Sequence, residues 1–337
     1  MENHDVAKFQ ISWKGIVVLL VLTATALYFI FTRLVNPSEM IEILSDYPLL
    51  FLFLAVLSMC LAWMVDALRV FIASRSIGFV ISYPVLVATL AASHFLTLVT
   101  PFTAGGFPFV IYILYKHGMS VGQAAGIVAS SGLAAQLGLI ALVSLVLNLM
   151  KEIPPQIASV FLYLKIIIWL YGIGVLFLVI ITSHGQKFRS WFERFSKYPN
   201  IAMWFGTFVS TFKRTFTNYG FYFLFTLICG SCYFGLNHLA GFFILTGFQP
   251  VPKLTFANFS MATLLGISPS FTPVPSGAGI SEAFSVYMLA NALPDDMLGT
   301  FIILWRTVLF YFPIVFGGCC FAYLFLIWSK SPKRRRK

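Results

Sequence analysis

The sequence predicts an all-α integral membrane protein with about six full transmembrane helices and two re-entrant helical hairpins in an inverted-topology repeat. Composition, run length and a Pro/Gly interruption that occurs twice carry this prediction. Of the 337 residues, 59% are apolar and only 10% are charged, and the mean hydropathy is +0.91. So few charges cannot cover a water-facing surface. Several runs reach the roughly 20 residues that cross a hydrocarbon core. The chain is therefore expected to work inside a bilayer, with no soluble domain large enough to act alone.

Apolar runs of two lengths follow one another along the chain. The long runs, each expected to be a full span, cover residues 15–32, 48–65, 121–150, 157–182, 219–246 and 298–328. The shorter runs come in two pairs, 84–100 with 107–115 and 254–271 with 280–293. Each pair forms either a re-entrant hairpin or two short full spans, and we expect hairpins. The first long run exceeds a signal-peptide core and lacks a small-residue cleavage site, so we expect it to be retained.

The basic residues predict the orientation. The formal net charge is +11, but the Lys and Arg residues cluster in short segments between apolar runs and at the end of the chain. With both termini cytoplasmic, 17 of the 22 Lys and Arg residues fall on the cytoplasmic side, as expected for a multi-pass protein of the inner membrane. Many of these basic residues lie in two segments, 184–217 and the tail 330–337. The first segment is expected to be amphipathic, with an aromatic stripe over residues 188–195. We expect no nucleic-acid partner.

Two Pro/Gly clusters interrupt the short pairs at equivalent places. The first covers residues 100–108 and the second 268–279. The unit of a span, a broken short pair and a span thus occurs twice, as repeat one at 48–150 and repeat two at 219–328. The first pair begins and ends inside and the second outside, so the two copies are inverted, a layout common among transporters. The alternative is that Pro and Gly merely kink ordinary spans and ease helix packing.

Backbone chemistry makes these clusters candidates for a binding site. Irregular backbone at membrane depth persists only where protein or a wet cavity satisfies it. A half-helix is expected to restart near Phe107 and near Ile280, with free N–H groups and a positive dipole end toward the membrane centre. Two such ends would suit an anion such as a phosphate. The expected substrate-binding residues in the clusters are Thr100, Pro101, Gly105, Gly106, Pro273, Pro275, Gly277 and Gly279.

Charged residues within apolar runs are expensive and usually face protein or water. Glu282 falls in the first turn of the second half-helix and Arg306 in the following span. They are either a buried pair that fixes the hairpin, or a phosphate ligand (Arg306) with a gate or cation partner (Glu282). Asp66, beside Arg69, is expected at a solvated helix end. Lys165 is expected to extend toward the interface.

Enzyme chemistry finds no support in the sequence. It contains no nucleophile elbow, Walker loop or metal motif. His94 and His238 are expected to be hydrogen-bonded helix residues, and the five cysteines to be small apolar packing groups. We therefore expect no catalytic residue, no metal and no cofactor.

The interrupted motifs resemble a known family. Residues 100–109, Thr-Pro-Phe-Thr-Ala-Gly-Gly-Phe-Pro-Phe, resemble the first motif of the lysylphosphatidylglycerol synthase transmembrane (flippase-like) family. Residues 273–282, Pro-Val-Pro-Ser-Gly-Ala-Gly-Ile-Ser-Glu, look like its Pro-Thr-Pro-Gly-Gly-x-Gly-x-x-Glu motif. Arg306 with Tyr311 and Pro313 is similar to its closing Arg-x-x-x-x-Tyr-x-Pro pattern. The resemblance implies a single membrane domain over residues 1–337 that moves an aminoacylated phospholipid or related lipid-linked substrate between leaflets.

Two departures from that family limit the expectation. Full synthases append an aminoacyltransferase domain, which we do not expect here because the basic residues 334–337 follow the last span directly. Val274 and Ser276 also stand where Thr and Gly are usual. Synthase activity is therefore not expected, and the lipid is left open. The alternatives are an ion-coupled carrier of a small anion, and a non-transporting partner of an envelope lipid or glycan enzyme. The expected partner is a membrane phospholipid or lipid-linked substrate, with a homo-oligomer and a separate lipid-modifying enzyme left open.

Overall fold

The structure, a computed structural model, is helical wherever it forms regular elements. It describes residues 37–100, 105–150, 153, 158, 161–183, 199–215, 220–249, 253–268, 277, 279–290 and 292–330. The expected first span at 15–32 and the aromatic stripe at 188–195 lie outside these residues.

The first half of the chain contains a long helix, a pair of short helices and a second long helix. Their bounds are α2 Pro37–Asp46, α3 Leu49–Ser76, α4 Tyr83–Val99, α5 Gly106–Lys116 and α6 Val121–Leu149. Pro84 in the first turn of α4 fits a position where no N–H is needed. Ser120 and Gln123 form a reciprocal capping box that fixes the start of α6. The short pair and its long neighbour therefore begin where local sequence signals place them.

The second half repeats this order after two further helices. Its elements are α8 Phe161–Ser183, α10 Pro199–Lys213, α11 Gly220–Gly247, α12 Phe256–Ile267, α13 Ile280–Leu289, α14 Asp295–Arg306, the π-helical segment η5 Thr307–Tyr311 and α15 Phe312–Lys330. Four stretches of the described chain are long and apolar enough to cross a membrane: Leu49–Ser76, Val121–Leu149, Phe221–Gly247 and Met297–Leu326. The expected spans over these regions are confirmed as long apolar helices. The predicted span 157–182 overlaps α8, whose stretch Phe161–Phe177 is a shorter apolar helix.

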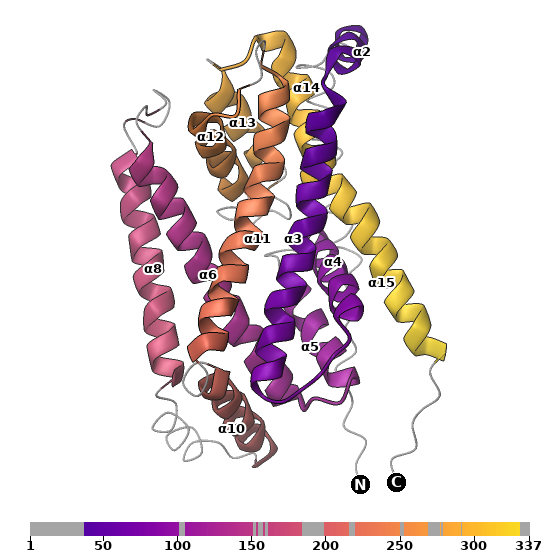
Figure 1. The fold of residues 1–337 in the computed structure, drawn as a ribbon, viewed down its shortest axis with the longest axis vertical. Helices are drawn as coiled ribbons and strands as arrows, with labels where there is room; N and C mark the ends of the chain where they lie inside the picture. The colour runs from indigo at the N-terminus through magenta and orange to yellow at the C-terminus, as the bar shows by residue number, and fades with distance from the viewer. Residues whose placement is uncertain are drawn as a thin grey trace.

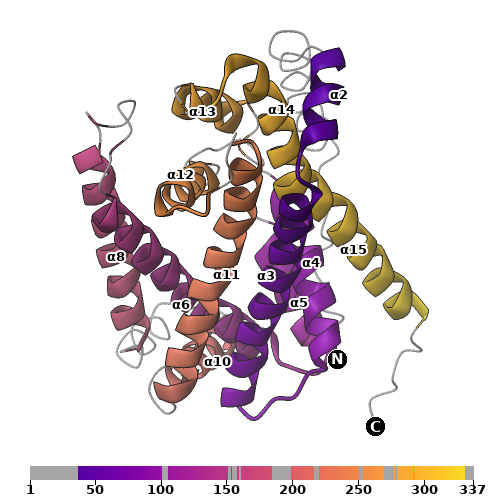
Figure 2. The same ribbon diagram turned by 45° about the horizontal axis from the view of Figure 1, so that its top comes forward.

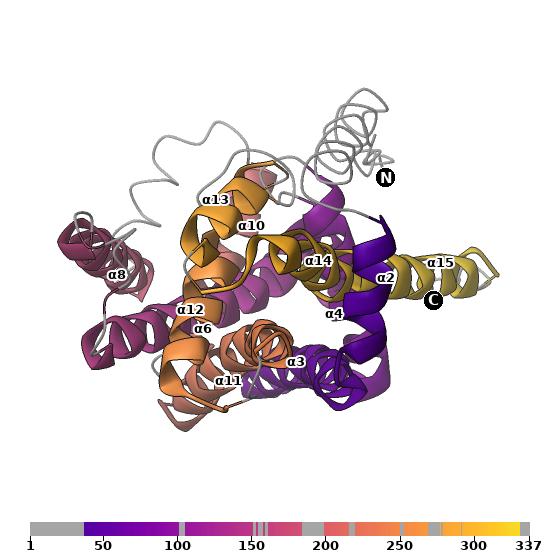
Figure 3. The same cartoon turned by 90° about the horizontal axis from the view of Figure 1, so that it is seen from above.

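The two short pairs lie toward opposite ends of the molecule. Helices α3 and α11 pack along one another through the centre (Figure 1). In the same view α4 and α5 lie in the lower half, whereas α12 and α13 lie in the upper half. In Figure 2, which is turned so that the top comes forward, α12 and α13 again lie in the upper part of the molecule, above α4 and α5. Seen from above, α8 and α15 lie on opposite sides of the bundle (Figure 3).

Two hydrophobic clusters fill the bundle. The smaller one packs α4, α5 and α6 against the second half of α3, through Val70, Leu86, Leu114 and Ile127. The larger one runs across both halves, because it joins the first half of α3 and residues of α4, α6 and α8 to α11–α15. Outside these cores, α8 exposes a continuous apolar surface: Leu162, Tyr163, Ile166, Ile167, Trp169, Leu170, Ile173, Leu176, Phe177 and Ile180. Such a surface is what a lipid-facing helix presents.

Candidate functional site

The second half-helix begins where the sequence predicts, at Ile280. Gly279 precedes α13 with a φ of 83°, a backbone conformation that glycine adopts without steric cost. The Glu282 Oε2 atom accepts a hydrogen bond of 2.7 Å from the Gly279 N–H. A carboxylate at this end of a helix is favoured by the helix dipole. Glu282 therefore caps α13 and, at 8% exposed, places a negative charge inside the protein.

Arg306 approaches the same carboxylate from the end of α14. Its Nη2 atom lies 2.6 Å from Glu282 Oε2 and 3.4 Å from the Gly277 carbonyl oxygen, which accepts a hydrogen bond. The guanidinium also lies over the ring of Phe310, with its carbon 3.9 Å from the ring centroid. Arg306 is 3% exposed. A buried arginine, a capped helix start and a backbone carbonyl thus meet at one point.

A change of helix type follows directly after Arg306. Thr307–Tyr311 forms a π-helical turn before α15 continues. π-helical turns are rare in proteins, and those that occur are often found at functional sites. The extra residue in such a turn changes the direction of the side chains around it. The sequence predicted one span over 298–328; the structure gives an uninterrupted helical run with this turn inside it.

The first half-helix begins at Gly106, as predicted, but its start is held differently. The Thr100 hydroxyl donates to the Leu96 carbonyl at 2.6 Å and accepts from the Gly105 N–H at 2.8 Å. A Cβ added to Gly106 would collide with Ser93 and Thr97 of α4. The glycine therefore lets α5 start against α4, and a neutral hydroxyl takes the N–H that a carboxylate takes in α13.

The structure groups the predicted site residues into two sets. Thr100, Gly105 and Gly106 form the first set, in which Thr100 binds Gly105. Gly277, Gly279, Glu282 and Arg306 form the second set, whose hydrogen bonds and ion pair join its own members. Pro101, Pro273 and Pro275 lie outside the described residues. Whether the two half-helices share one substrate stays a prediction.

The expectation for Asp66 was wrong. The helix does not end near residue 65 but continues as α3 to Ser76, so Asp66 and Arg69 lie within it and are 8% and 7% exposed. The Arg69 Nε–H donates to Asp66 Oδ1 at 2.7 Å, one turn away. Pairing within the helix lets it carry both charges into the interior. The overlooked signal was an acid and a base at i,i+3 with apolar sequence on both sides.

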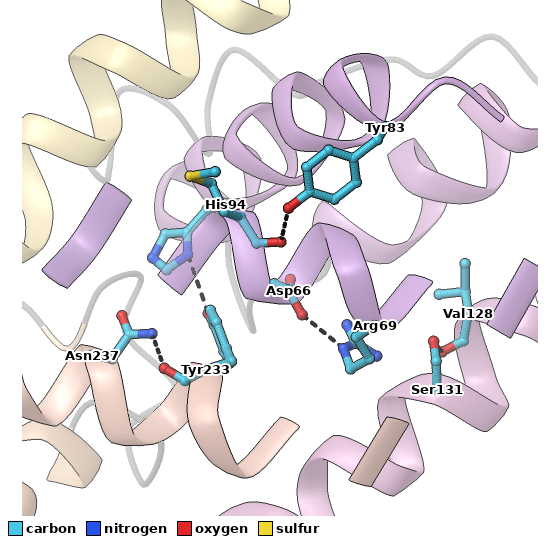
Figure 4. Close-up of polar contacts among 9 residues, drawn as sticks. Asp66, Arg69, Tyr83, His94, Val128, Ser131, Tyr233 and Asn237 are labelled. Carbon is cyan, nitrogen blue, oxygen red and sulfur yellow. Dashed lines mark hydrogen bonds and ion pairs between the residues drawn. The ribbon is translucent and has the colours of Figure 1, made fainter. Parts of the chain in front are cut away.

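Figure 4 shows further polar groups facing this pair. Tyr233 of α11 lies near Asp66, and its hydroxyl is 3.4 Å from His94 Nδ1 on α4. The Asn237 side chain donates to the Tyr233 carbonyl at 2.8 Å. The expectation that His94 is hydrogen-bonded is therefore confirmed. His238 was expected to be hydrogen-bonded as well, but its Nε2 atom is buried and makes no hydrogen bond to any described residue.

Lys165 behaves as an interfacial side chain. Its Nζ atom donates to Asn148 Oδ1 at 3.1 Å and lies over the Phe161 ring at 4.9 Å from the centroid. Both partners are within reach of the helix end, and the contact is exposed. This geometry agrees with a stem that packs on apolar groups while the ammonium is solvated.

Long apolar helices, charges buried between them and two short apolar helix pairs together define a polytopic helical membrane protein. Residues 15–317 match the family described as the lysylphosphatidylglycerol synthase TM region. That match covers well over half of the chain, so the protein belongs to this family. The family description is of a transmembrane region and carries no enzyme activity to this chain.

One curated relative is similar over nearly its whole length. It is a UPF0104 membrane protein of Archaeoglobus fulgidus, 24% identical over 347 aligned positions that cover 94% of this chain and 98% of the relative. The similarity therefore extends beyond the two glycine-containing motifs to the spans between them. The relative's name describes a membrane protein and gives no activity.

Proposed function

We propose that this protein moves a phospholipid, or another lipid-linked headgroup, from one leaflet of the bilayer to the other without chemically altering it. Membership of a transmembrane-region family supports a membrane substrate. The short helix pairs toward opposite ends of the bundle support an inverted repeat, with residues 48–150 and 219–328 as its copies (Figure 1). In this proposal the two pairs are re-entrant hairpins, and the whole chain is one membrane domain.

The observation that carries the proposal is the convergence of Arg306, Glu282 and the start of α13. A guanidinium presents its N–H groups in a planar fork that matches phosphate oxygen atoms. A helix start favours the same negative charge. In the structure the Glu282 carboxylate binds both of these groups, with Oε2 at 2.6 Å from Arg306 Nη2 and 2.7 Å from the Gly279 nitrogen. A headgroup phosphate would take over Arg306 from Glu282, which would remain as the cap of α13 or hold a cationic headgroup substituent.

Orientation and cellular location follow from the distribution of basic residues. We propose a multi-pass protein of the cell membrane with both termini in the cytoplasm, because that arrangement puts most Lys and Arg residues on the cytoplasmic side. Labelling single cysteines introduced near each terminus with an impermeant reagent, in intact and in opened cells, tests this orientation. Labelling in intact cells would contradict it.

Leaflet exchange of a labelled lipid tests the proposed function. The purified chain, reconstituted into vesicles, is expected to accelerate exchange of a labelled anionic or aminoacylated phospholipid, and Arg306→Ala is expected to abolish the acceleration. Arg75→Ala is the matched control, because Arg75 is an exposed arginine at the end of α3. Failure of the wild-type chain across a panel of lipids would overturn the proposal. Uptake of inorganic phosphate into the lumen instead would assign the protein to carriers of small anions.

A further inference from the structure

Arg69 lies inside the helical bundle with a hydrogen-bonding group that no described residue uses. It is 7% exposed, and its Nε–H donates to Asp66. Its Nη1 atom is buried and makes no hydrogen bond within the part of the chain that the structure describes. A guanidinium keeps its charge and all five donors in a protein. A buried donor without an acceptor is unfavourable, so this nitrogen is available to an acceptor atom that a ligand supplies.

Trp63 carries a second donor of the same kind, less than two turns earlier on α3. Its Nε1–H is buried and unpartnered among the described residues. The indole ring is held firmly: it lies edge-on to His94 at a centroid distance of 6.3 Å and stacks on Phe312 and Phe316 at 5.6 and 5.2 Å. Because an indole N–H can only donate, this group also requires an acceptor atom. Asp66 lies between the two donors along the helix.

Neutral groups from two other helices complete the cluster. The Tyr233 hydroxyl of α11 is 3.4 Å from His94 Nδ1 of α4, at the outer limit of a hydrogen bond. Asp66 is close enough to act electrostatically on both side chains. In Figure 4 Tyr233 and Arg69 lie on either side of Asp66. The Asn237 side chain also acts on the Tyr233 hydroxyl, so this hydroxyl lies among polar groups and can exchange its long contact with His94 for an incoming oxygen atom.

We propose that Arg69, Trp63 and Tyr233 form a second anion site, which binds the phosphate of the lipid headgroup in the half of the protein opposite to Arg306. This inference rests on the proposed function. A phosphate group offers several acceptor oxygen atoms, enough for the guanidinium, the indole and the phenol at once. Asp66 holds the guanidinium through Nε and leaves Nη1 for the ligand. The headgroup would then have one arginine site on each side of the centre.

Aromatic side chains connect the two arginines. The Arg306 guanidinium lies over Phe310. Phe312, two residues further along the same helical run, stacks on Trp63, which in turn touches His94. Trp63 therefore contacts the helix that carries Arg306 on one side and the polar cluster on the other. In this proposal the rings therefore link the two buried charges by direct contact.

Counting bound lipids by native mass spectrometry in maltoside micelles tests the second site, because the detergent carries no phosphate. The wild-type chain is expected to retain two phosphatidylglycerol molecules and no diacylglycerol, its phosphate-free counterpart. Arg69→Gln is expected to retain one, since loss of a charge-assisted hydrogen bond weakens binding about tenfold or more. Trp63→Phe keeps the ring stack and removes only the N–H, so it should weaken the same site about threefold to tenfold. Arg75→Gln, exposed on the same helix, is expected to retain two.

Two retained lipids with wild-type affinity in both Arg69→Gln and Trp63→Phe would overturn the second site. Displacement of the Arg69-dependent lipid by an equimolar amount of inorganic phosphate would assign the site to free phosphate and overturn the lipid assignment. Leaflet exchange, measured separately, distinguishes this inference from the proposed function. Exchange by the wild-type chain, together with unchanged lipid retention in both Arg69→Gln and Trp63→Phe, overturns only the second site. If the chain retains two lipids that depend on Arg69 and Arg306 but does not accelerate leaflet exchange, only the proposed transport is overturned.

Discussion

Among the described residues, each half of the protein contains a buried pair of an arginine and a carboxylate, but the two pairs are built differently. Asp66 and Arg69 are one turn apart on α3 and can pair as soon as that helix forms. Glu282 and Arg306 belong to different helices, and α13 and α14 must pack before their charges meet. The first pair therefore stabilises a helix that carries it, whereas the second stabilises a tertiary arrangement.

The half-helix starts differ in the same way. In the first half the Gly105 N–H is held by Thr100, a neutral hydroxyl close in sequence. In the second half the Gly279 N–H is held by a carboxylate that also binds the distant Arg306. A ligand that competes for Arg306 would therefore separate α14 from the cap of α13, while the start of α5 would be unaffected. This difference makes the second pair of short helices the expected moving part of the molecule.

The largest expected effect follows removal of the non-local arginine. Arg306→Ala leaves the Glu282 carboxylate buried without its cation, which is expected to lower the free energy of unfolding by about 3–5 kcal/mol. Titration with a denaturing detergent in mixed micelles measures this change. The double variant Glu282→Leu with Arg306→Leu removes both charges, and is expected to regain most of the stability while leaflet exchange stays lost. Equal stability of Arg306→Ala and wild type would show that the pair is not buried as described.

The local pair is expected to be less sensitive. Asp66→Asn retains an oxygen atom for the Arg69 Nε–H but removes the charge, and should lower the free energy of unfolding by about 1.5–3 kcal/mol. The same detergent titration applies. Adding Arg69→Gln to Asp66→Asn turns the pair into two neutral amides and should recover part of the loss. A larger loss for Asp66→Asn than for Arg306→Ala would reverse the comparison between the two halves.

The next largest loss of stability is expected where α5 packs closely on α4. A Cβ at Gly106 would press on Ser93 and Thr97 of α4, so Gly106→Ala is expected to cost about 2–3 kcal/mol, toward the upper end of the usual range for overpacking. Gly174 on α8 is the matched control, because nothing lies within 4 Å of a Cβ added there. Gly174→Ala should be neutral or slightly stabilising. Similar results for both alanine variants would argue against close packing of α5 on α4.

The smallest effect is expected at the start of α13. Gly279 has a φ of 83°, and nothing lies within 4 Å of a Cβ added to it. Gly279→Ala therefore introduces backbone strain alone, worth about 1–2 kcal/mol, as for a residue held in a sparsely populated backbone conformation. Thermal denaturation should show a lower melting temperature for Gly279→Ala than for wild type, whereas Gly174→Ala, at an equally open position inside a helix, should melt like wild type. Wild-type melting of Gly279→Ala would contradict strain as the cause.

Apolar run length determined most of the fold in advance. The starts and ends of α4, α5, α6 and α11 fall within one or two residues of the predicted segments, because each is a hydrophobic run closed by a Pro, Gly or Ser signal. The restarts near 107 and 280 followed from the positions of the glycines. The family could also be recognised from these motifs, since the residues themselves match its pattern.

Only the tertiary structure decided which charges are buried and with which partner. Sequence alone left Glu282 and Arg306 open between a structural pair and a ligand site; packing of α13 against α14 brings them to 2.6 Å. Sequence placed Asp66 at a solvated end, because a charge in an apolar run resembles a helix end. Packing of α4, α6 and α11 around α3 buries it instead. Hydropathy is a local property that the chain carries with it, whereas the surroundings of a charge depend on which distant helices enclose it.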